Sequence, residues 1–464
     1  MRIATPTLRR WFSNDTAGHS KLKTPHTEVP ILSKQQSRAY IFLGLFFILS
    51  LLPSLGMWIF GGSKAGANEI LAPKPSLTEK DGSYNLKVLS ELSDYLSDRV
   101  FLRQEAITLR NKISVKLFST SPSKKVTLGR DDWLFYAETL SGEALSEKEL
   151  WCAAENLKLL QEAAESRGSE FLFVLCPNKS SLLPEAVGYG TPSEDGKRFE
   201  ALLQDMGVAH SSLYDALLRR ADCYYHTDSH WNATGAAIAA DAINASLGRK
   251  TRYADGPFRE GLGHSGDLSA MLFPAAPTVE TDWVYPFTFR YTSDYHGPGD
   301  PTIATESEGE GSLSCYRDSF GNDLHPFLAE SFQRSVFSRK TAFDLTALDS
   351  DVLLIELVER NIDYLYAYDH TYPAPQRDVT VETRDAAAIS CTLSAAGELT
   401  RISGKLESFD AAPLYLLTDG RLYECAPKSD GFTICVSEFS EGKLLYRRDG
   451  QYYAAELETV SNEQ

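Results

Sequence analysis

The sequence predicts an α/β fold in which a doubly wound, mostly parallel sheet of about five strands follows one membrane helix and precedes a small β domain. Three features predict it: helical patterns alternate with short apolar runs, one long segment near the N-terminus is uncharged, and short β-type runs fill the last part. Such apolar runs are typical of parallel strands buried on both faces. The expected basic leader, membrane helix, helical lead-in, α/β domain and β domain lie at residues 1–38, 39–60, 61–128, 129–371 and 372–464.

The uncharged segment 39–60 is long enough to cross a bilayer, which takes about 20 apolar residues in a helix. Seven basic and two acidic residues precede it, whereas only Lys64 follows closely, so the positive-inside bias keeps the leader in the cytoplasm and exports the rest. A buried core helix would show a polar stripe, and this segment has none. A cleavable signal peptide, with a small-residue site at residues 65–67, is the main rival and exports the same body.

Composition describes a chain with a large core and an acidic exported part. Hydrophobic residues make up 43% and aromatic residues 11% of the chain, which excludes a disordered protein. The formal net charge of the whole chain is −17, and because the leader is basic, the remainder carries about −22. No nucleic-acid partner is therefore expected. The seven cysteines form no zinc-type spacing, so neither a metal, a cofactor nor a disulfide framework is expected, although Cys425 and Cys435 could pair.

Helical and strand patterns alternate through the middle of the chain. Residues 146–149 read Ser-Glu-Lys-Glu, a capping box that predicts a helix start. Helices are expected over 147–167, 195–206 and 232–248. Buried strands are expected over 170–176, 207–212, 312–317, 334–338 and 351–357. The lead-in at 68–127 is expected to be helical and amphipathic, and the stretch 296–312, rich in Gly, Pro and acid, to be an exposed loop.

The pattern changes after a Pro-containing linker at 372–378. Short β-type runs then alternate with Gly and Asp turns, which predicts a small antiparallel β domain. We expect residues 375–464 to fold independently of the α/β domain.

Two segments place reactive side chains where a parallel sheet puts its sites, at the carboxyl ends of strands. Residues 224–232 precede a helix, and residues 315–322 follow a strand. Ser319 on a strand-to-helix turn would expose its hydroxyl, and Asp228 could orient His230 as the base that deprotonates it. Taken singly, these residues are more often a helix cap, a turn residue and a packed imidazole. Their combination favours a Ser-His-Asp site.

These segments resemble a known family. DSHWNATGA at 228–236 is similar to the Asp-x-His-Trp signature of the alginate O-acetyltransferase-like, SGNH hydrolase-like DHHW proteins, and RDSFGN at 317–322 is similar to their nucleophile block. Four weaker matches occur in the family's order at residues 129–136, 176–185, 266–272 and 358–361. The resemblance covers residues 90–365, and it implies an SGNH-like fold for the α/β domain.

The resemblance implies that Ser319 is the nucleophile, His230 the general base and Asp228 the residue that orients it. Ser229 stands where the family often has a second His, and an extended backbone would point it away from the chemistry. The oxyanion donors stay open, with candidates Asn178, Lys179, Arg317 and the amide of Phe320. The C-terminal part matches no known pattern, and the family's carbohydrate-binding modules give only a loose analogy.

The implied protein is a membrane-anchored, extracytoplasmic acyl-transfer enzyme that adds acetyl groups to, or removes them from, a cell-surface polysaccharide. Its acetyl group would come from a membrane O-acyltransferase partner. The sequence leaves open which glycan is modified, which molecule donates the acetyl group, and whether the acetyl group is transferred or hydrolysed. A non-catalytic glycan-binding or export protein on the same fold is the alternative, since fold does not fix function. A lipase or simple esterase is disfavoured because no GxSxG elbow surrounds a serine in the expected order.

The expected topology can be tested with reporter fusions after residue 120. A reporter that is active only outside the cytoplasm should be active there, because the basic leader holds the N-terminus inside. An inactive fusion, together with an active cytoplasmic reporter at the same site, would contradict export.

Overall fold

The computed structural model describes residues 34–66, 69–220, 222–256, 258–340, 343–345, 349–367 and 369–460. The chain divides into two compact units, one up to Gly62 and one from Ser63 onward. Most of the expected basic leader, residues 1–33, lies outside the described residues.

The first unit contains α1 (Lys34–Phe60), which begins before the predicted membrane segment and includes Pro53. By length and composition, Gln35–Phe60 is able to cross a bilayer, and no other helix of the described chain is. Its large apolar side chains are exposed, which differs from the packing of a soluble core helix. The observed helix therefore remains a candidate membrane anchor.

The lead-in contains two helices, α2 (Val88–Ser97) and α3 (Arg103–Phe118), and is otherwise irregular, so the prediction of a helical stretch over 68–127 was wrong in part. Pro73 and Pro75 cannot donate the hydrogen bonds of a helix interior and break it before α2. On α3, the Asn111 side chain donates to the Leu272 carbonyl at 2.7 Å, and the Ala275 amide donates to the Thr108 hydroxyl. Helix α3 thus packs against the α/β domain.

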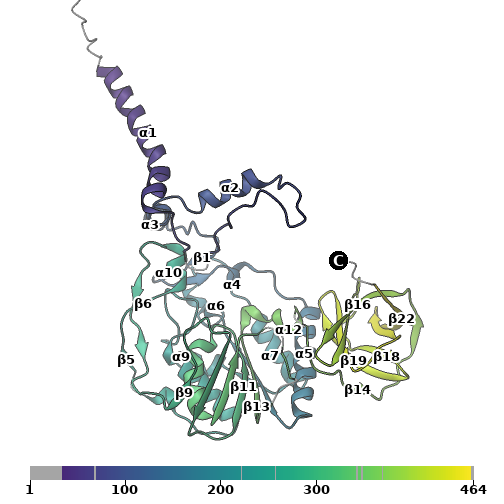
Figure 1. The fold of residues 1–464 in the computed structure, drawn as a ribbon. Helices are drawn as coiled ribbons and strands as arrows, with labels where there is room; N and C mark the ends of the chain where they lie inside the picture. The colour runs from purple at the N-terminus through teal and green to yellow at the C-terminus, as the bar shows by residue number, and fades with distance from the viewer. Residues whose placement is uncertain are drawn as a thin grey trace, which may run out of the picture. The chain divides into compact units, whose positions relative to one another are not determined.

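The α/β domain begins with a short hairpin and then alternates helices with strands (Figure 1). Its helices are α4 (Glu138–Ser141), α5 (Glu147–Glu165), α6 (Lys179–Leu182), η1 (Pro184–Ala186), α7 (Asp195–Asp205), α8 (Tyr214–Leu218), α9 (Ala233–Ser246), η2 (Tyr253–Asp255), α10 (Asp267–Leu272), α11 (Gly321–Ser331), η3 (Glu359–Asn361) and α12 (Tyr364–Ala367). Its strands are β1 (Val126–Leu128), β2 (Leu134–Tyr136), β3 (Glu170–Cys176), β4 (His210–Ser212), β5 (Arg259–Glu260), β6 (His264–Ser265), β7 (Val279–Glu280), β8 (Trp283–Val284), β9 (Tyr291–Ser293), β10 (Thr302–Ser307), β11 (Ser312–Tyr316), β12 (Arg334–Ser338) and β13 (Val352–Val358). The predicted capping box is present at α5, where Ser146 and Glu149 bond reciprocally.

The central sheet has seven strands in the order β4-β3-β13-β11-β12-β10-β9. The five strands predicted from the sequence are its first five, and they are mutually parallel, while β10 and β9 add an antiparallel edge. The prediction that 296–312 is a loop was wrong, because it contains β10. There Ile303 and Thr305 are buried and their neighbours exposed, the period-two pattern of a strand with one buried face.

Helices cover both faces of the sheet. Along β3, Phe171 and Phe173 face a core that α5 and α7 complete, whereas Leu172 and Val174 face a second core shared with α9 and α11. This alternation is the doubly wound arrangement. It leaves the carboxyl ends of β3, β11 and β13 side by side at one edge of the sheet.

The C-terminal part is a nine-stranded β-barrel-like sheet, drawn in yellow in Figure 1. Its strands are β14 (Gln376–Arg377), β15 (Thr383–Asp385), β16 (Ile389–Ala396), β17 (Leu399–Lys405), β18 (Leu414–Thr418), β19 (Arg421–Lys428), β20 (Gly431–Val436), β21 (Lys443–Arg448) and β22 (Gln451–Thr459). The pairing of β19 with β20 closes seven of these strands into a ring, while β14 and β15 each pair on one side only, with β19 and β22. The expectation of an antiparallel domain was wrong in part, since most strand pairs are antiparallel but β15 and β16 both run parallel to β22. Cys425 and Cys435 are buried free thiols and do not pair.

Helix α5 joins the barrel to the α/β domain through one continuous apolar core. The buried Asn156 side chain donates to the carbonyls of Leu365, at 2.8 Å, and Pro427, at 2.9 Å, so it bonds both parts at once. Arg377 at the start of the barrel pairs with Glu162 of α5. Independent folding of residues 375–464 stays a prediction.

Replacing Asn156 with Ala should lower the free energy of unfolding by about 1–3 kcal/mol, because two buried carbonyls lose their donor. Chemical denaturation of the purified protein measures this loss. Glu165→Ala at the exposed end of the same helix is the control and should stay within about 0.5 kcal/mol of wild type. Equal stability of Asn156→Ala and wild type would contradict this account of the junction.

Candidate active site

Ser319 lies on the turn between β11 and α11, at the carboxyl end of the central strand. The carboxylate of Asp318 holds this turn. It accepts hydrogen bonds from the amide of Phe320 at 2.9 Å, the amide of Val358 at 2.7 Å and the side chain of Asn361 at 2.8 Å. The serine turn is therefore fixed to the end of the neighbouring strand β13.

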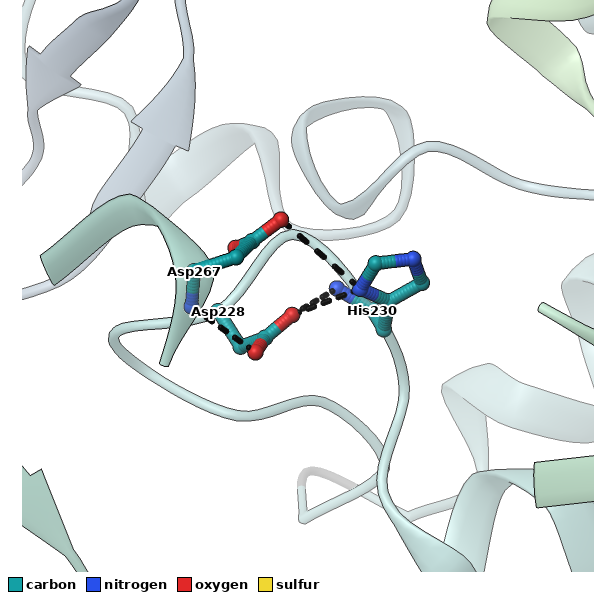
Figure 2. Close-up of side chains that lie close together, drawn as sticks. All are labelled: Asp228, His230 and Asp267. Atoms are coloured by element: carbon teal, nitrogen blue, oxygen red, sulfur yellow. Dashed lines mark hydrogen bonds and ion pairs between the residues drawn. The ribbon is translucent and has the colours of Figure 1, made fainter. Parts of the chain in front are cut away.

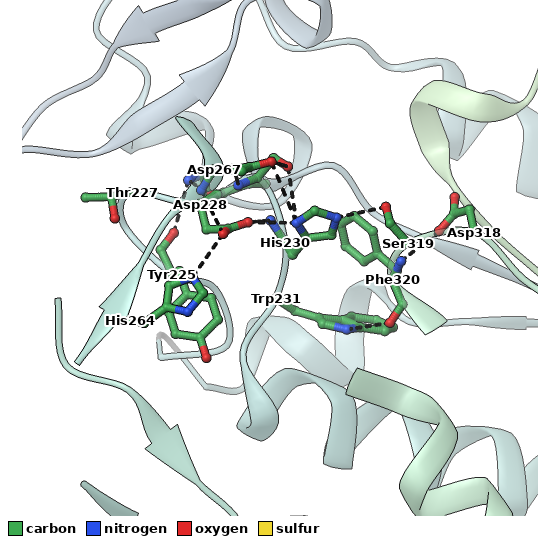
Figure 3. Close-up of polar contacts among 12 residues, drawn as sticks. Tyr225, Thr227, Asp228, His230, Trp231, His264, Asp267, Asp318, Ser319 and Phe320 are labelled. Carbon is green, nitrogen blue, oxygen red and sulfur yellow. Dashed lines mark hydrogen bonds and ion pairs between the residues drawn. The ribbon is translucent and has the colours of Figure 1, made fainter. Parts of the chain in front are cut away.

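The structure brings the three predicted site residues together (Figure 3). His230 Nε2 lies 2.8 Å from Ser319 Oγ, and His230 Nδ1 lies 2.7 Å from Asp228 Oδ1. Both distances fall within the reach of about 2.6–3.2 Å that a serine and its base need. A segment before α9 and a turn before α11 thus meet at the edge of the sheet.

The loop that carries Asp228 and His230 is shaped by contacts on both sides. Asn232 caps α9 by accepting from the amides of Thr234 and Gly235. The indole of Trp231 donates to the Phe320 carbonyl at 3.1 Å, which ties the histidine loop directly to the serine turn.

Lys179 also holds this loop in place, through hydrogen bonds to its backbone carbonyls. Its ammonium donates to the carbonyls of Tyr225 at 3.0 Å, His226 at 3.1 Å and Asp228 at 2.5 Å, and it lies over the Trp133 ring. Burial lowers the pKa of Lys179 to about 7. The sequence suggested Lys179 as a possible hydrogen-bond donor to the oxyanion, but its ammonium donates to three carbonyls of the loop instead.

The charges of the triad are set by opposing effects. Burial raises the pKa of Asp228, but hydrogen bonds from His230 and His264 lower it more, so the carboxyl stays ionised. Burial lowers the pKa of His230, but the hydrogen bond with Asp228 and its charge raise it above the ordinary histidine value. The Asp228 carboxylate therefore holds a proton on Nδ1 and leaves Nε2 free to accept one from Ser319.

Asp267 adds a second carboxylate beside His230 (Figure 2). Its oxygens accept from the amide and the hydroxyl of Ser229, both at 2.7 Å, and one lies 3.8 Å from His230 Nδ1. The expectation that Ser229 points away from the site was wrong, because this segment bends and Ser229 lines the cavity. Burial and the charge of Asp228 raise the pKa of Asp267.

Asp228, His230 and Asp267 place three potential metal-ligand atoms within 4.8 Å of one another. A cation there would need the lone pair of His230 Nδ1, which the tautomer facing Asp228 does not offer. Both carboxylate oxygens of Asp267 already accept hydrogen bonds from Ser229. The donor set therefore suits a hydrogen-bonded network.

A cavity of about 640 Å³ opens over Ser319 and His230, within the size range of small-ligand sites. Its lining mixes aromatic, cationic and acidic side chains. They include Tyr136, Tyr316, Phe343 and Tyr364, with Lys125, Arg317, Arg339, Lys340 and Arg360, and with Glu138, Asp267, Asp318 and Asp363. Such a lining suits a polar ligand with apolar faces, as a sugar has.

The structure changes the set of oxyanion candidates. The Phe320 amide is bound to Asp318, and Asn178 borders a neighbouring cavity instead. Arg317 lines the Ser319 cavity, and within the described chain its Nε and Nη2 have no partner. Arg360 and Asn361, which lie in the weakly matching segment 358–361 but were assigned no role from the sequence, line it as well. Their position directly after the strand β13 was the signal that could have found them.

Part of the chain that carries this site is similar to known proteins. Residues 126–291 match the model of the SGNH hydrolase-like domain of the acetyltransferase AlgX. A probable alginate O-acetylase AlgJ of Pseudomonas syringae is 26% identical over 194 residues, which cover 38% of this chain and 49% of that protein. A probable alginate O-acetylase AlgJ of Pseudomonas putida is 24% identical, covering 44% and 52%. The chain thus spans about half the length of these curated relatives.

Two solved structures are similar at low identity. Bacillus cereus PatB1 aligns with a TM-score of 0.42 and 17% identity over 51% of this chain and 95% of that chain. The O-acetyltransferase domain of Pseudomonas putida AlgJ aligns with a TM-score of 0.39 and 17% identity over 51% and 91%. By the family model, residues 126–291 are similar to the SGNH hydrolase-like domain of AlgX, and together with the AlgJ relatives this match confirms the resemblance to the alginate O-acetyltransferase-like, SGNH hydrolase-like proteins.

Proposed function

We propose that this protein is an extracytoplasmic, membrane-anchored acyl-transfer enzyme that adds acetyl groups to, or removes them from, a cell-surface polysaccharide. The observation that carries the proposal is the unbroken hydrogen-bond chain from Asp228 through His230 to Ser319. Ser319, at the end of this chain, lines the cavity of about 640 Å³. The names of the relatives, which are probable alginate O-acetylases, support a polysaccharide acceptor.

In the proposed reaction, Ser319 Oγ attacks the carbonyl carbon of an acetyl ester while its proton moves to His230 Nε2. The charge on the carbonyl oxygen is stabilised by donors from Arg317 and Arg360, which line the cavity. Collapse of the tetrahedral intermediate breaks the ester bond, and the leaving oxygen takes the proton from His230. A sugar hydroxyl or water then attacks the acetyl-serine by the same steps in reverse.

The location and the partner belong to the same proposal. Helix α1 anchors the chain, and the basic residues before it keep the leader inside. An acetyl donor made in the cytoplasm has to cross the membrane before it reaches Ser319. The resemblance to the family implies a membrane O-acyltransferase as the partner that delivers the acetyl group.

The proposed serine chemistry predicts that Ser319→Ala lowers the release of acetate from a chromogenic acetyl ester by about 10³-fold or more, with His230→Ala equally damaging and Asp228→Ala less so. Ser314→Ala, on strand β11 five residues earlier in the sequence, is the matched control and should keep wild-type activity. Equal activity of wild type and Ser319→Ala would favour the non-catalytic glycan-binding alternative.

The proposed base predicts a specific pH dependence. His230 accepts the serine proton only when it is neutral, so kcat/KM should rise with pH and reach half its maximum above about 6.5. Asp228→Asn removes the charge that raises the pKa of His230, so the midpoint of the residual activity should move to lower pH. A midpoint in Asp228→Asn at or above that of wild type would contradict the assignment.

A further inference from the structure

We propose that His264 is a positioning residue of the active site, which holds one oxygen of the Asp228 carboxylate so that the other stays aimed at His230. This inference rests on the proposed function. His264 Nε2 lies 2.9 Å from Asp228 Oδ2, while His230 Nδ1 lies 2.7 Å from Asp228 Oδ1 (Figure 3). Two imidazoles thus share one carboxylate, one on each oxygen.

The surrounding strands fix the His264 ring in place. His264 lies on β6, which pairs with β7 so that His264 is opposite Glu280. Its ring stacks on Tyr225 at 3.8 Å between centroids and 11° between planes. The hydroxyl of Tyr225 donates to Asp282 at 2.6 Å, and the carbonyl of Tyr225 accepts from Lys179. The His264 ring that contacts Asp228 is therefore held by Tyr225, which is itself fixed by its hydrogen bonds with Asp282 and Lys179.

His264 acts through Asp228 and not on the substrate. The Ser319 hydroxyl is hydrogen-bonded to His230, and His264 is absent from the lining of the cavity. A carboxylate bound at one oxygen only can rotate about its Cβ–Cγ bond, which would turn the oxygen away from His230 Nδ1. The contacts of Oδ2 with His264 and with the Asp267 amide, at 3.0 Å, oppose that rotation.

The charges around His264 suit a donor toward a carboxylate. The acidic groups that face it are Asp228, Glu280, Asp282 and Asp323, and the nearby cation is Lys179. Burial lowers the pKa of His264, but the hydrogen bond and charge of Asp228 raise it above its ordinary value, so Nε2 carries a proton in either charge state. His264 therefore donates to Asp228 whether it is neutral or charged.

The test replaces His264 with Gln and with Asn, whose side-chain amide nitrogens lie at different distances from the backbone. The Nε2 of Gln lies the same number of bonds from the backbone as the Nε2 of His, whereas the Nδ2 of Asn is one bond shorter. With 4-nitrophenyl acetate and the full chain, His264→Asn should lower kcat by about 10- to 100-fold with KM within about twofold, because misplacement of a catalytic group costs that much. His264→Gln should restore kcat to within about threefold of wild type. His296→Asn, at an exposed histidine away from the site, should leave both constants unchanged.

The outcomes separate this inference from the proposed function. A Ser319-dependent wild-type activity that His264→Asn leaves unchanged, or that His264→Asn and His264→Gln lower equally, overturns the positioning role alone. A loss in KM without a loss in kcat overturns it as well. Equal rates for wild type and Ser319→Ala overturn the proposed function and, with it, the role of His264.

Discussion

The buried carboxylate of Asp228 is the group on which the site depends. Four hydrogen bonds reach it, from the ring and the amide of His230, from the ring of His264 and from the amide of Asp267. A buried charge is unstable unless such donors replace water. The loop, β6 and the start of α10 must therefore stay together for Asp228 to stay ionised, and its charge in turn makes His230 basic enough to deprotonate a serine.

Two further anchors connect this carboxylate to the rigid sheet. Lys179, just after β3, holds the loop by its carbonyls, and Asp318, just after β11, holds the serine turn against β13. Both follow the carboxyl ends of parallel strands that flank β13, so the spacing of the strands sets the spacing of the reactive groups. The Trp231 bond to the Phe320 carbonyl closes the link between the two anchored segments. A serine and a histidine 89 positions apart are thereby kept within hydrogen-bond distance.

Local patterns in the sequence were enough for the features that local physics decides. The apolar runs gave the five parallel strands, the Ser146–Glu149 capping box gave the start of α5, and the DSHW and RDSF segments gave the three residues that the structure joins. Features that depend on distant pairing were missed. The sequence of strand β10 resembles a polar loop, and its pairing with β12 makes it a strand. The parallel pairing of β16 with β22 joins residues 68 positions apart. His264 and Asp267 lie more than 30 residues beyond Asp228; His264 is outside every segment that resembles the family, and Asp267 is in the weakly matching segment 266–272, to which no role was assigned.

The central claim is that Ser319 carries the acetyl group during the reaction, and mass spectrometry of the protein mixed rapidly with an acetyl ester tests it most directly. The account predicts one added acetyl group on the peptide that contains Ser319, with slower decay in Asp228→Asn, whose His230 is a weaker base. An acetyl group found on another residue, or full turnover with no acetyl group on that peptide, would contradict it.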